Sequence, residues 1–502
     1  MPIVASNPAD MVEKADAVMR DNSFIEFRLD YLPKPGLALQ KIKAFVEYHP
    51  EALIIVTCRR AAAGGKFRGS IASEIDILVK AANQGCHLID LEIESAAHLK
   101  PADFNRLRRS ASLILSSHDF RGTRKLEETF ARMSQYPADF FKVVSTANTL
   151  SDNAVMMKFL EGHSHEHSMI GVCMGEQGII SRVLGVRAGS QFTFGAVGPG
   201  EETAPGQIAA RELRDVYRIE QVDAATRVYG VAGDPVAHSL SPIMLNTAFR
   251  RENVNAVYLA LHAKSMSDLL ACVRDIPIHG LSITMPYKEE ILKHLDKTDA
   301  MTAKIGACNT VVRSQDGKLY GFNTDVTGVV RPLESRLPLP GAKILVLGAG
   351  GAGRAAVFGL KERSAEVYVF NRTPGPAQNL AKKARAKAVN KMQLKKMAFD
   401  VIINATPVGM EGNRDPIPVS EQEFNAKYFF EMVYTPAETR MVKMARAKGM
   451  NVILGSEMFV QQGARQFEIW SGKPAPMQEM QRVIEYALAQ RAAAKDNEKK
   501  GK

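Results

Sequence analysis

The amino-acid sequence predicts an α/β protein that has a closed (β/α)8 barrel in its first half and a doubly wound α/β domain in its second. Short apolar runs alternate with amphipathic stretches through residues 2–195, and a glycine-rich turn separates an apolar run from a helical stretch at 343–363. A chain of 502 residues also exceeds the ~250–300 residues that one hydrophobic core usually supports. We therefore expect at least two domains.

Eight apolar runs in the first half are predicted to be parallel strands, because alternating strand and helix units fold into parallel sheets. They are residues 3–5, 24–29, 53–58, 88–93, 113–117, 140–145, 169–174 and 192–194. Eight such units in about 200–250 residues are typical of a closed (β/α)8 (TIM) barrel. An open doubly wound sheet is the alternative.

Catalytic groups of such a barrel lie at the carboxyl ends of its strands, and polar residues gather there: Glu26, Arg28, Arg59, Asp90, Glu92, His118, Lys142 and Arg182. Lys142 stands inside the run FFKVV, where burial would lower its pKa and favour an amine nucleophile toward a ketone. The alternative is an ion pair with Glu26 or Glu92. His118 suits a general base, or it only bonds backbone at a loop start. The arginines can bind a carboxylate substrate or pair with nearby acids.

The second half contains a dinucleotide-binding pattern. Gly348, Gly350 and Gly353 have G-x-G-x-x-G spacing between the apolar run 344–347 and the helical stretch 354–363. This context predicts a tight turn whose helix N-terminus faces a pyrophosphate. About 20 residues on, where NAD enzymes carry an acid, the chain reads Asn371-Arg372-Thr373. Since a guanidinium suits a 2′-phosphate, the predicted cofactor is NADP rather than NAD; a solvated loop charge is the alternative for Arg372.

Composition argues against several other classes of protein. No apolar run reaches the ~18 residues of a membrane span, and the first residues lack the pattern of a signal peptide. The five cysteines are scattered, which suggests free thiols in a reducing cytoplasm. The net charge of +11 is spread along the chain, so anionic small substrates are favoured over nucleic acid. No metal site is expected at the loop GHSHEH (162–167), and the tail from 491 to 502 is expected to be a disordered basic segment.

Several motifs of the first half resemble type I 3-dehydroquinate dehydratase. They are EFRLD, SSHDF, FFKVVSTANTLSD, GIISRVLG, FGAV and TAPGQ, in that family's order over nearly all of residues 1–210. The resemblance implies that Lys142 forms an imine with the substrate ketone and that His118 removes the C2 proton. It also implies a set of substrate-binding residues: Glu26, Arg28, Arg59, Arg182, Thr203 and Gln207. Where the family usually has a Glu that supports the histidine, this sequence has Ala63, so Asp119, Asp90 or Glu92 is expected to orient His118.

Motifs of the second half resemble shikimate dehydrogenase over residues 227–490. They are SLSP, LSITMPYKEEIL, IGACNTVV, LYGFNTDVTGV, GAGGAG, NRT, NATPVGM, MVYTP and GSEMFVQQGARQFEIW. The resemblance implies that Lys288 and Asp325 are catalytic. It implies that the substrate is bound by Ser239, Ser241, Thr284, Asn309, Thr324, Tyr434 and Gln462, with both serines on the carboxylate. It implies that NADP is bound by Gly348, Ala349, Gly350, Gly351, Ala352, Gly353, Asn371, Arg372, Thr373, Thr406, Met432 and Gly455.

Together these features predict a bifunctional enzyme of aromatic biosynthesis, which makes dehydroshikimate and reduces it to shikimate. The predicted domains are a barrel at 1–224, a substrate-binding domain at 225–338, a Rossmann domain at 339–455, and helices at 456–490 that return to the substrate domain. Two alternatives remain: quinate as the second substrate, or a regulatory homologue with dead sites. We expect small-molecule partners, no nucleic acid or membrane, and a cytoplasmic location; a homo-oligomer is left open.

Overall fold

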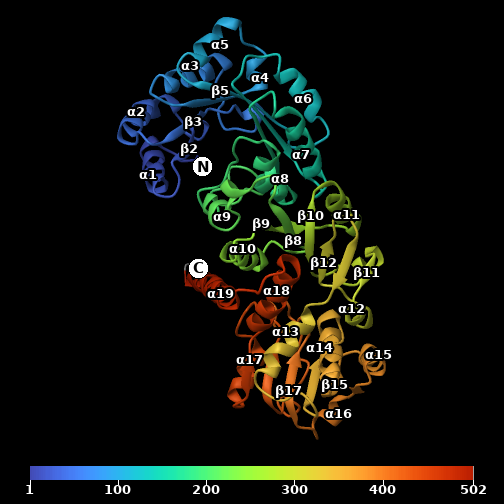
Figure 1. Cartoon of the computed structure of the whole chain (residues 1–502). Coiled ribbons are helices and arrows are strands. Elements are labelled where there is room, and N and C mark those ends of the chain that lie inside the picture. Colours follow the sequence, from blue (N-terminus) through green and yellow to red (C-terminus); the bar gives the residue numbers. More distant parts are fainter. Residues whose placement is uncertain (501–502) are drawn as a thin grey trace. The chain divides into compact units, whose positions relative to one another are not determined.

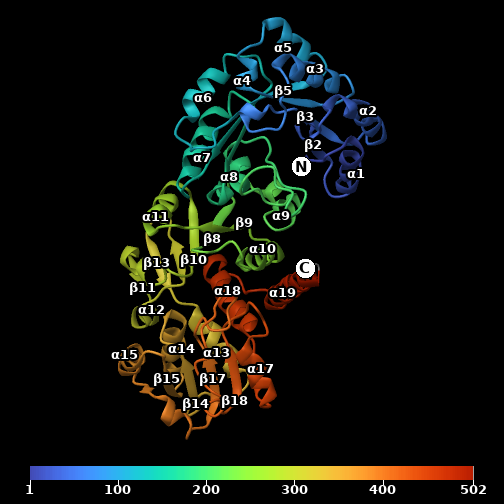
Figure 2. The ribbon, with the colours of Figure 1, turned by 180° about the vertical axis from the view of Figure 1, so that it is seen from behind.

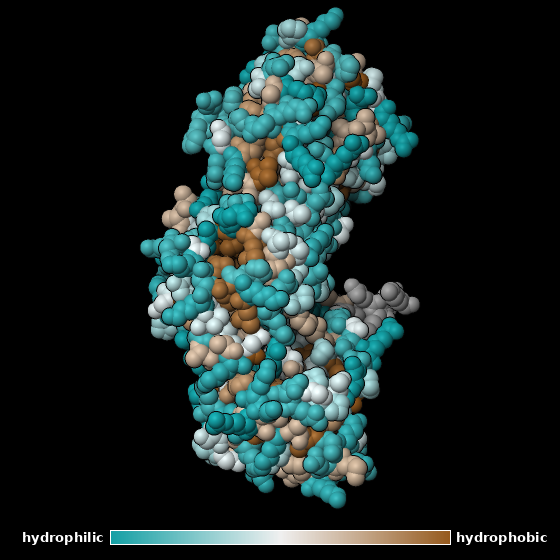
Figure 3. All heavy atoms as spheres, turned by 90° about the vertical axis from the view of Figure 1, so that its right-hand side faces the viewer, coloured by the Kyte–Doolittle hydropathy of each residue, from teal (hydrophilic) through white to brown (hydrophobic). Residues whose placement is uncertain are grey.

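The computed structural model describes residues 1–500, with side chains through Ala494. The chain divides into two compact units, Met1–Thr226 with Leu261–Pro277, and Arg227–Ala260 with Ile278–Lys502. Figures 1 and 2 show both from opposite sides. On the face in Figure 3, hydrophilic side chains predominate and apolar ones gather in a few places. Within the described residues, no helix is both long enough and apolar enough to cross a membrane.

The first unit is built on a parallel sheet whose strands follow chain order, β1 to β7. The strands are β1 (Pro2–Ile3), β2 (Phe24–Arg28), β3 (Leu53–Thr57), β4 (Leu88–Glu92), β5 (Ser112–His118), β6 (Phe140–Thr146) and β7 (Met169–Met174). The helices are α1 (Pro8–Met19), α2 (Leu39–Tyr48), α3 (Ile71–Ala82), α4 (Ile93–Ala96), α5 (Pro101–Arg108), α6 (Leu126–Met133), α7 (Asp152–His163), α8 (Ile179–Leu184) and α9 (Ala210–Asp215). This is the strand-and-helix alternation of a TIM-type barrel.

The predicted eighth strand at 192–194 is wrong, since the sheet contains seven strands among the described residues. Phe192 and Phe194 instead pack by their rings, Phe192 against Phe24 with centroids 4.9 Å apart, and Phe194 against Phe192 at 5.6 Å. One isolated bridge joins Ala196 to Ala209. The apolar side chains of this segment therefore pack against Ile114 and Ile170 of the sheet and form no backbone ladder, a distinction that an apolar run does not reveal.

The second unit begins with a mixed sheet in the order β11-β13-β12-β10-β8-β9. Its strands are β8 (Arg227–Gly233), β9 (Ala256–His262), β10 (Ile278–Ile283), β11 (Lys297–Thr298), β12 (Thr310–Arg313) and β13 (Leu319–Phe322). The helices of the second unit in this stretch are α10 (Ser241–Arg251) and α12 (Ala300–Ile305), whereas α11 (Met266–Asp275) belongs to the first unit. Strand β10 pairs parallel with β8 and antiparallel with β12.

A second sheet of the same unit is parallel throughout, in the order β16-β15-β14-β17-β18-β19. Its strands are β14 (Lys343–Leu347), β15 (Glu366–Phe370), β16 (Lys387–Ala388), β17 (Phe399–Asn404), β18 (Ala426–Glu431) and β19 (Asn451–Ile453). The accompanying helices are α13 (Asp325–Glu334), α14 (Gly351–Glu362), α15 (Pro374–Ala384), α16 (Lys391–Leu394) and α17 (Arg440–Ala447). The strand order reverses at β14, which is where doubly wound sheets bind nucleotides.

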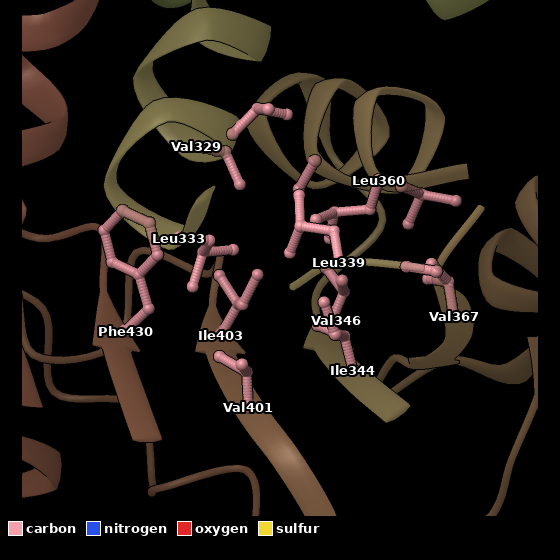
Figure 4. Packing of buried hydrophobic residues seen from close by; sticks show 14 of the residues in the cluster. Val329, Leu333, Leu339, Ile344, Val346, Leu360, Val367, Val401, Ile403 and Phe430 are labelled. Carbon is pink, nitrogen blue, oxygen red and sulfur yellow. The ribbon is translucent and has the colours of Figure 1, made fainter. Parts of the chain in front are cut away.

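The core of this sheet is closed on one side by α13 and α14. Val329 and Leu333 of α13 and Leu360 of α14 point onto Val346 and Ile403 of the sheet, as Figure 4 shows. All five are almost fully buried. Burial of such an aliphatic side chain contributes about 1.5–3 kcal/mol to the free energy of folding. This packing therefore holds α13, which starts at Asp325, against the strands next to the glycine turn.

Helices α18 (Gly455–Ser471) and α19 (Met477–Lys500) follow the last strand. Phe467 and Trp470 of α18 and Met480 of α19 share a core with the mixed sheet and α10, and the Trp470 indole N–H donates to the Val311 carbonyl at 3.1 Å. Helix α19 also runs over most of the tail for which composition suggests disorder. The alanines at 492–494 are strong helix formers, which accounts for the difference; residues 501–502 lie outside the described part.

Candidate active sites

Lys142 lies within β6, four residues before its carboxyl end, and is 4% exposed. Its ammonium donates to Asp90 Oδ2 at 2.8 Å and stands over the Phe194 ring, 4.0 Å from the centroid. Asp90 also accepts from the Ser116 hydroxyl at 2.6 Å. Burial pushes the pKa of Asp90 up, but the charges of Lys142 and Arg59 outweigh it and hold that pKa well below its usual range. The partner of Lys142 is therefore Asp90, and not the Glu26 or Glu92 suggested by the sequence.

His118 ends β5 and faces Glu92, which ends β4. The His118 Nδ1 atom and the Arg59 Nε atom both lie 2.7 Å from Glu92 Oε1, although neither N–H is aimed along the line to that oxygen. Burial and the Arg59 charge lower the pKa of His118, so the imidazole is neutral near pH 7 and can accept a proton. Such contacts commonly tighten when a substrate binds.

The carboxylate that faces His118 is thus identified among the three candidates. Asp90 belongs to Lys142, and Asp119 accepts from the Arg121 backbone N–H at 2.7 Å, as a loop residue does. Ala63 lies in a short 3-10 turn after β3 and brings no polar side chain. Asp90 and Glu92 are two residues apart on β4, so both point to the same face of the strand.

The remaining barrel residues divide into paired and unpaired groups. Arg28 makes a two-pronged ion pair with Asp30, at 2.9 Å on each side, and Glu26 accepts from the Thr57 hydroxyl at 2.5 Å. Arg182 is 2% exposed, and its one hydrogen bond within the described chain goes to the Pro205 carbonyl at 3.1 Å. Burial lowers its pKa to about 10. A buried guanidinium without a carboxylate is costly, which makes Arg182 suited to an anionic ligand.

Residues 203–207, which follow β7 in the chain, lie next to Arg182. Gln207 Oε1 accepts from the backbone N–H of Thr203 at 2.8 Å and from its hydroxyl at 3.2 Å. The Arg182 partner, Pro205, belongs to the same TAPGQ turn. The structure thus brings Thr203, Gln207 and Arg182 together, as the sequence motifs suggest.

A second constellation lies in the other unit, around Asp325 at the start of α13. Lys288 follows β10 and donates to Asp325 Oδ2 at 2.6 Å. The Asn309 amide donates to Asp325 Oδ1 at 2.7 Å and to the Thr324 hydroxyl at 3.0 Å. Lys288, Asn309 and Asp325 come from three separate sequence motifs, and their side chains contact one another at the Asp325 carboxylate. Asp325 is buried, with an exposed fraction of 4%.

The other predicted substrate residues of this unit come from four segments. Ser239 and Ser241 lie at the N-terminus of α10, where the Ser241 backbone N–H donates to Ser239 Oγ at 3.2 Å. Thr284 follows β10 directly, and its N–H donates to the Ala232 carbonyl. Tyr434 stacks on Phe459 with centroids 4.6 Å apart. Gln462 of α18 donates to the Phe459 carbonyl at 2.8 Å.

The glycine turn after β14 has the shape that a dinucleotide requires. Gly348 has a φ of 107°, which favours glycine, and a Cβ on Gly353 would lie 2.3 Å from the Gly348 carbonyl oxygen. A Cβ on Gly350 would meet nothing within 4 Å, so open space remains above the N-terminus of α14, which begins at Gly351 within the motif. The backbone N–H groups from Ala349 to Gly353, including Ala352, fit a pyrophosphate, whereas the Gly348 N–H donates to the Phe370 carbonyl at 2.8 Å.

Other predicted cofactor residues border the same strand ends. Asn371 donates to the Thr373 carbonyl at 2.9 Å, and Arg372 is 76% exposed, with its guanidinium 3.4 Å from Asp415. Thr406 donates to Asn404 Oδ1 at 2.6 Å. Met432 follows β18, and a Cβ on Gly455 would lie 2.4 Å from the Val433 carbonyl, so the α18 N-terminus approaches this strand closely.

Sequence reasoning missed one buried acid, Glu431 at the end of β18. It is fully buried and accepts from Asn404, from the Thr439 hydroxyl at 2.8 Å and from the Val433 N–H at 3.1 Å. Burial raises its pKa to about 7. The signal was available, because an acid that ends an apolar strand is the pattern that singled out Glu92. Through Asn404, Glu431 supports the turn that contains Thr406.

Comparison with known proteins supports the reading of both units. The model of type I 3-dehydroquinase matches residues 1–224. The shikimate dehydrogenase substrate-binding domain matches 231–311, the shikimate/quinate 5-dehydrogenase model 333–409, and the shikimate 5′-dehydrogenase C-terminal domain 455–485.

Individual relatives agree with these matches. The chloroplastic bifunctional 3-dehydroquinate dehydratase/shikimate dehydrogenase of Arabidopsis thaliana is 34% identical over 95% of this chain and 82% of its own. The NADP(+) shikimate dehydrogenase of Pyrococcus furiosus is 38% identical over 52% of this chain and 96% of its own. The crystal structure of Thermus thermophilus shikimate 5-dehydrogenase with NADP(H) and shikimate is 36% identical and covers 52% of this chain and all of its own, with a TM-score of 0.49.

The folds and the two constellations define a two-enzyme chain, in which a dehydratase barrel precedes an NADP-dependent dehydrogenase. The chain belongs to the family of bifunctional 3-dehydroquinate dehydratase/shikimate dehydrogenases. It is an α/β enzyme of the shikimate pathway that converts 3-dehydroquinate to 3-dehydroshikimate and reduces the latter to shikimate. Its cofactor is NADP.

Proposed function

We propose that Lys142 is the imine-forming nucleophile of the dehydratase and His118 its general base. The Lys142 amine adds to the ketone of 3-dehydroquinate and water leaves, which gives a protonated imine. This imine draws electrons from C2, so that His118 can take the C2 proton. Loss of a substrate hydroxyl as water and hydrolysis of the imine then release 3-dehydroshikimate. The support is the burial of Lys142 beside Asp90 and the neutral state of His118.

We assign three roles to the residues around this pair. Arg182 binds the substrate carboxylate, which is supported by its burial without a carboxylate partner in the described chain. Glu92 holds His118 through Nδ1 and leaves Nε2 to act as the base. Asp90 keeps the amine in place before the substrate arrives. Glu26, Arg28, Arg59, Thr203 and Gln207 complete the substrate site.

In the dehydrogenase we propose that Lys288 and Asp325 form one proton-donating pair, supported by their 2.6 Å contact. Ser239 and Ser241 bind the substrate carboxylate at the N-terminus of α10, and Asn309, Asp325 and Gln462 bind the ring hydroxyls. Thr284, Thr324 and Tyr434 border this site. Held in this way, the ketone lies where Lys288 can protonate its oxygen as the alcohol forms.

The glycine turn and the strand ends around it would hold NADP. Residues 348–353 take the pyrophosphate, while Asn371, Arg372 and Thr373 lie where a 2′-phosphate would be recognised. Thr406, Met432 and Gly455 are assigned to the nicotinamide side. When bound, NADPH supplies the hydride for ketone reduction. The exposed guanidinium of Arg372 is available to a phosphate, since its partner Asp415 lies at 3.4 Å in solvent.

The observation that carries this proposal is the pair of separate constellations, Lys142 with His118 and Lys288 with Asp325, on one chain. The test is to incubate the protein with 3-dehydroquinate, with and without NADPH, and to identify the products. We expect dehydroshikimate without the cofactor and shikimate with it. Recovery of unchanged dehydroquinate from folded protein would favour a regulatory homologue. Faster oxidation of quinate with NAD than of shikimate with NADP would favour the quinate alternative.

We further propose small-molecule partners, namely 3-dehydroquinate, 3-dehydroshikimate and shikimate, and a reducing cytoplasmic setting. The second point is supported by the five cysteines, which are all buried and free. The Arabidopsis relative is, by its name, chloroplastic. Activity that is equal with and without a thiol reductant at 37 °C, in air, would argue against a need for reducing surroundings.

A further inference from the structure

The carboxylate of Glu431 joins the ends of two neighbouring strands of the parallel sheet. Asn404 ends β17 and Glu431 ends β18, and the two residues are partners in the ladder between these strands. The Asn404 amide donates to Glu431 Oε1 at 2.7 Å, and both residues have an exposed fraction of 0%. Neither belongs to the catalytic or binding sets proposed above. Both lie at the carboxyl ends of parallel strands, where a doubly wound sheet binds its nucleotide.

Asn404 fixes the loop that follows β17. Its Oδ1 atom accepts from the Thr406 hydroxyl at 2.6 Å and from the Thr406 backbone N–H at 3.1 Å, and its amide also donates to the Val408 carbonyl at 3.1 Å. This loop borders the glycine turn, since a Cβ on Gly348 would lie 2.9 Å from the Ala405 carbonyl oxygen. Asn404 therefore holds Thr406, which we assign to the nicotinamide side, next to the turn assigned to the pyrophosphate.

Glu431 fixes the segment that follows β18. Its Oε1 atom also accepts from the Val433 backbone N–H at 3.1 Å, and the Met432 backbone N–H donates to the Asn404 carbonyl at 3.1 Å. The other oxygen, Oε2, accepts at 2.8 Å from the hydroxyl of Thr439, the N-cap residue of α17. One carboxylate thus holds the segment with Met432 directly and the loop after β17 through Asn404.

From this geometry we infer that Glu431 and Asn404 are positioning residues, which hold Thr406 and Met432 in one fixed arrangement for the nicotinamide side of NADP. Buried polar groups keep their hydrogen-bond partners, and a network in which every member is engaged makes the chain around it rigid. Misplacement of reacting groups by about 1 Å can cost ~10²-fold in rate, so the arrangement of these two segments matters for reduction. The inference rests on the proposed assignment of Thr406 and Met432 to the cofactor.

Asn404→Ala cuts the link between Glu431 and the loop that contains Thr406. We expect reductase kcat to fall about tenfold or more, with the KM for dehydroshikimate within about twofold of the parent value. The Kd of NADPH, titrated by its own fluorescence without substrate, should rise about fivefold, because the loop must then be ordered on binding. The Kd of adenosine 2′,5′-bisphosphate, which lacks the nicotinamide, should not change. An equal loss of affinity for both ligands, or an unchanged Kd of NADPH, overturns the positioning role.

Glu431→Ala tests the carboxylate itself. It should match Asn404→Ala in both Kd values, since the two residues act in one network. Glu431→Gln should restore the Kd of NADPH to within about twofold of the parent value, because its amide oxygen can still accept from Asn404 and Val433. A folded Glu431→Ala protein that binds NADPH like the parent overturns the role of Glu431. If Glu431→Ala does not fold, the Asn404→Ala result decides.

Thr439→Val is the matched control. It removes the bond to Glu431 Oε2 and the side-chain cap of α17, while the bonds of Oε1 to Asn404 and Val433 stay in place. We expect the melting temperature to fall and the Kd of NADPH to stay at the parent value. A rise in that Kd equal to the rise in Asn404→Ala would mean that lost stability is responsible, and would overturn the inference.

Gly350→Val separates this inference from the cofactor site on which it rests. Gly350 has a φ of −75°, and a Cβ there would meet nothing within 4 Å, so the fold should tolerate a side chain that fills the space proposed for the pyrophosphate. NADPH and adenosine 2′,5′-bisphosphate should both lose at least about tenfold in affinity, as expected when bonds to a charged phosphate are lost. Unchanged binding of both ligands in Gly350→Val overturns the proposed NADP site itself, whereas the Asn404→Ala outcomes concern positioning alone.

Discussion

His118 and Glu92 stand side by side at the ends of neighbouring strands, with Nδ1 and Oε1 2.7 Å apart. The parallel register pairs Glu92 with Ser116, two residues before His118, so the two side chains project from the same edge of the sheet. Arg59 contacts the same oxygen at 2.7 Å. Glu92 is thereby held as an anion: burial raises its pKa, but His118 and Arg59 outweigh this and bring the pKa below its usual value.

Glu92→Gln should lower dehydratase kcat by about tenfold or more, since an oriented base contributes ~10²–10⁴-fold. Burial and the Arg59 charge lower the pKa of His118 below its ordinary value, and Glu92 partly opposes them. His118 must be neutral to accept a proton, so activity falls as pH drops through this pKa. Loss of the Glu92 charge should move that acid limb to still lower pH, as measured from kcat/KM against pH.

Glu94→Gln, an exposed neighbour on α4, is the control and should keep the parent profile. An acid limb that moves to higher pH in Glu92→Gln would contradict the assignment.

Lys142 should be trapped when the protein is mixed with 3-dehydroquinate and borohydride, because reduction makes the imine permanent. Intact-mass and peptide analysis should find the added mass on Lys142. Lys142→Ala should lose the adduct and the dehydratase activity, whereas Lys158→Ala, which removes an exposed lysine of α7, should keep both. Undiminished trapping in Lys142→Ala would rule out this nucleophile.

Arg372→Ala should raise the KM for NADPH much more than the KM for NADH. A guanidinium that bonds a phosphate contributes about 1.5–3 kcal/mol, and the exposure of Arg372 places the effect at the lower end, about tenfold. The measurement is the ratio of the two KM values in the reductase assay. Lys395→Ala removes another exposed charge of this domain and should leave the ratio unchanged; equal effects of Arg372→Ala on both cofactors would refute the 2′-phosphate contact.

Lys288→Ala should lower reductase kcat by ~10²–10⁴-fold with little change in the KM for dehydroshikimate, because proton donation acts in the transition state. Lys288→Ala/Asp325→Ala should be scarcely worse, since groups that act as a unit are not additive. Dehydratase activity, assayed on the same preparation, should persist. Lys293→Ala is an exposed control on the same loop. An unchanged reductase kcat, or loss of both activities in folded Lys288→Ala, would count against the pair.

Much of the fold follows from local pattern. Runs such as 344–347 and 169–174 are apolar throughout, as in parallel strands covered on both faces, and they appear as β14 and β7. The segment 192–194 failed this rule, because Phe192 and Phe194 are partly buried by ring contacts without a ladder. Apolar periodicity reports burial, and hydrogen-bond pairing with a distant strand has no local signal.

The residues of the barrel site could be predicted where a polar side chain interrupts or ends an apolar run. Lys142 and His118 each interrupt or end an apolar run, and so does Asp90. The pairing of Asp90 with Lys142 and of Glu92 with His118 could not be predicted. Asp90 and Glu92 lie on the same face of β4 and differ only in their position along the strand.

Residues 192–194, called the seam below, join no strand of the sheet among the described residues and leave β7 at its edge. Strands β4 to β6 are each bonded on both sides, whereas β7 is bonded only to β6 among the described strands. Amide protons on the interior strands should therefore exchange with solvent only through large openings, and those of the seam through small ones. Because the Phe194 ring lies 4.0 Å from the Lys142 ammonium, opening of the seam should also let water reach the lysine that we propose as the nucleophile.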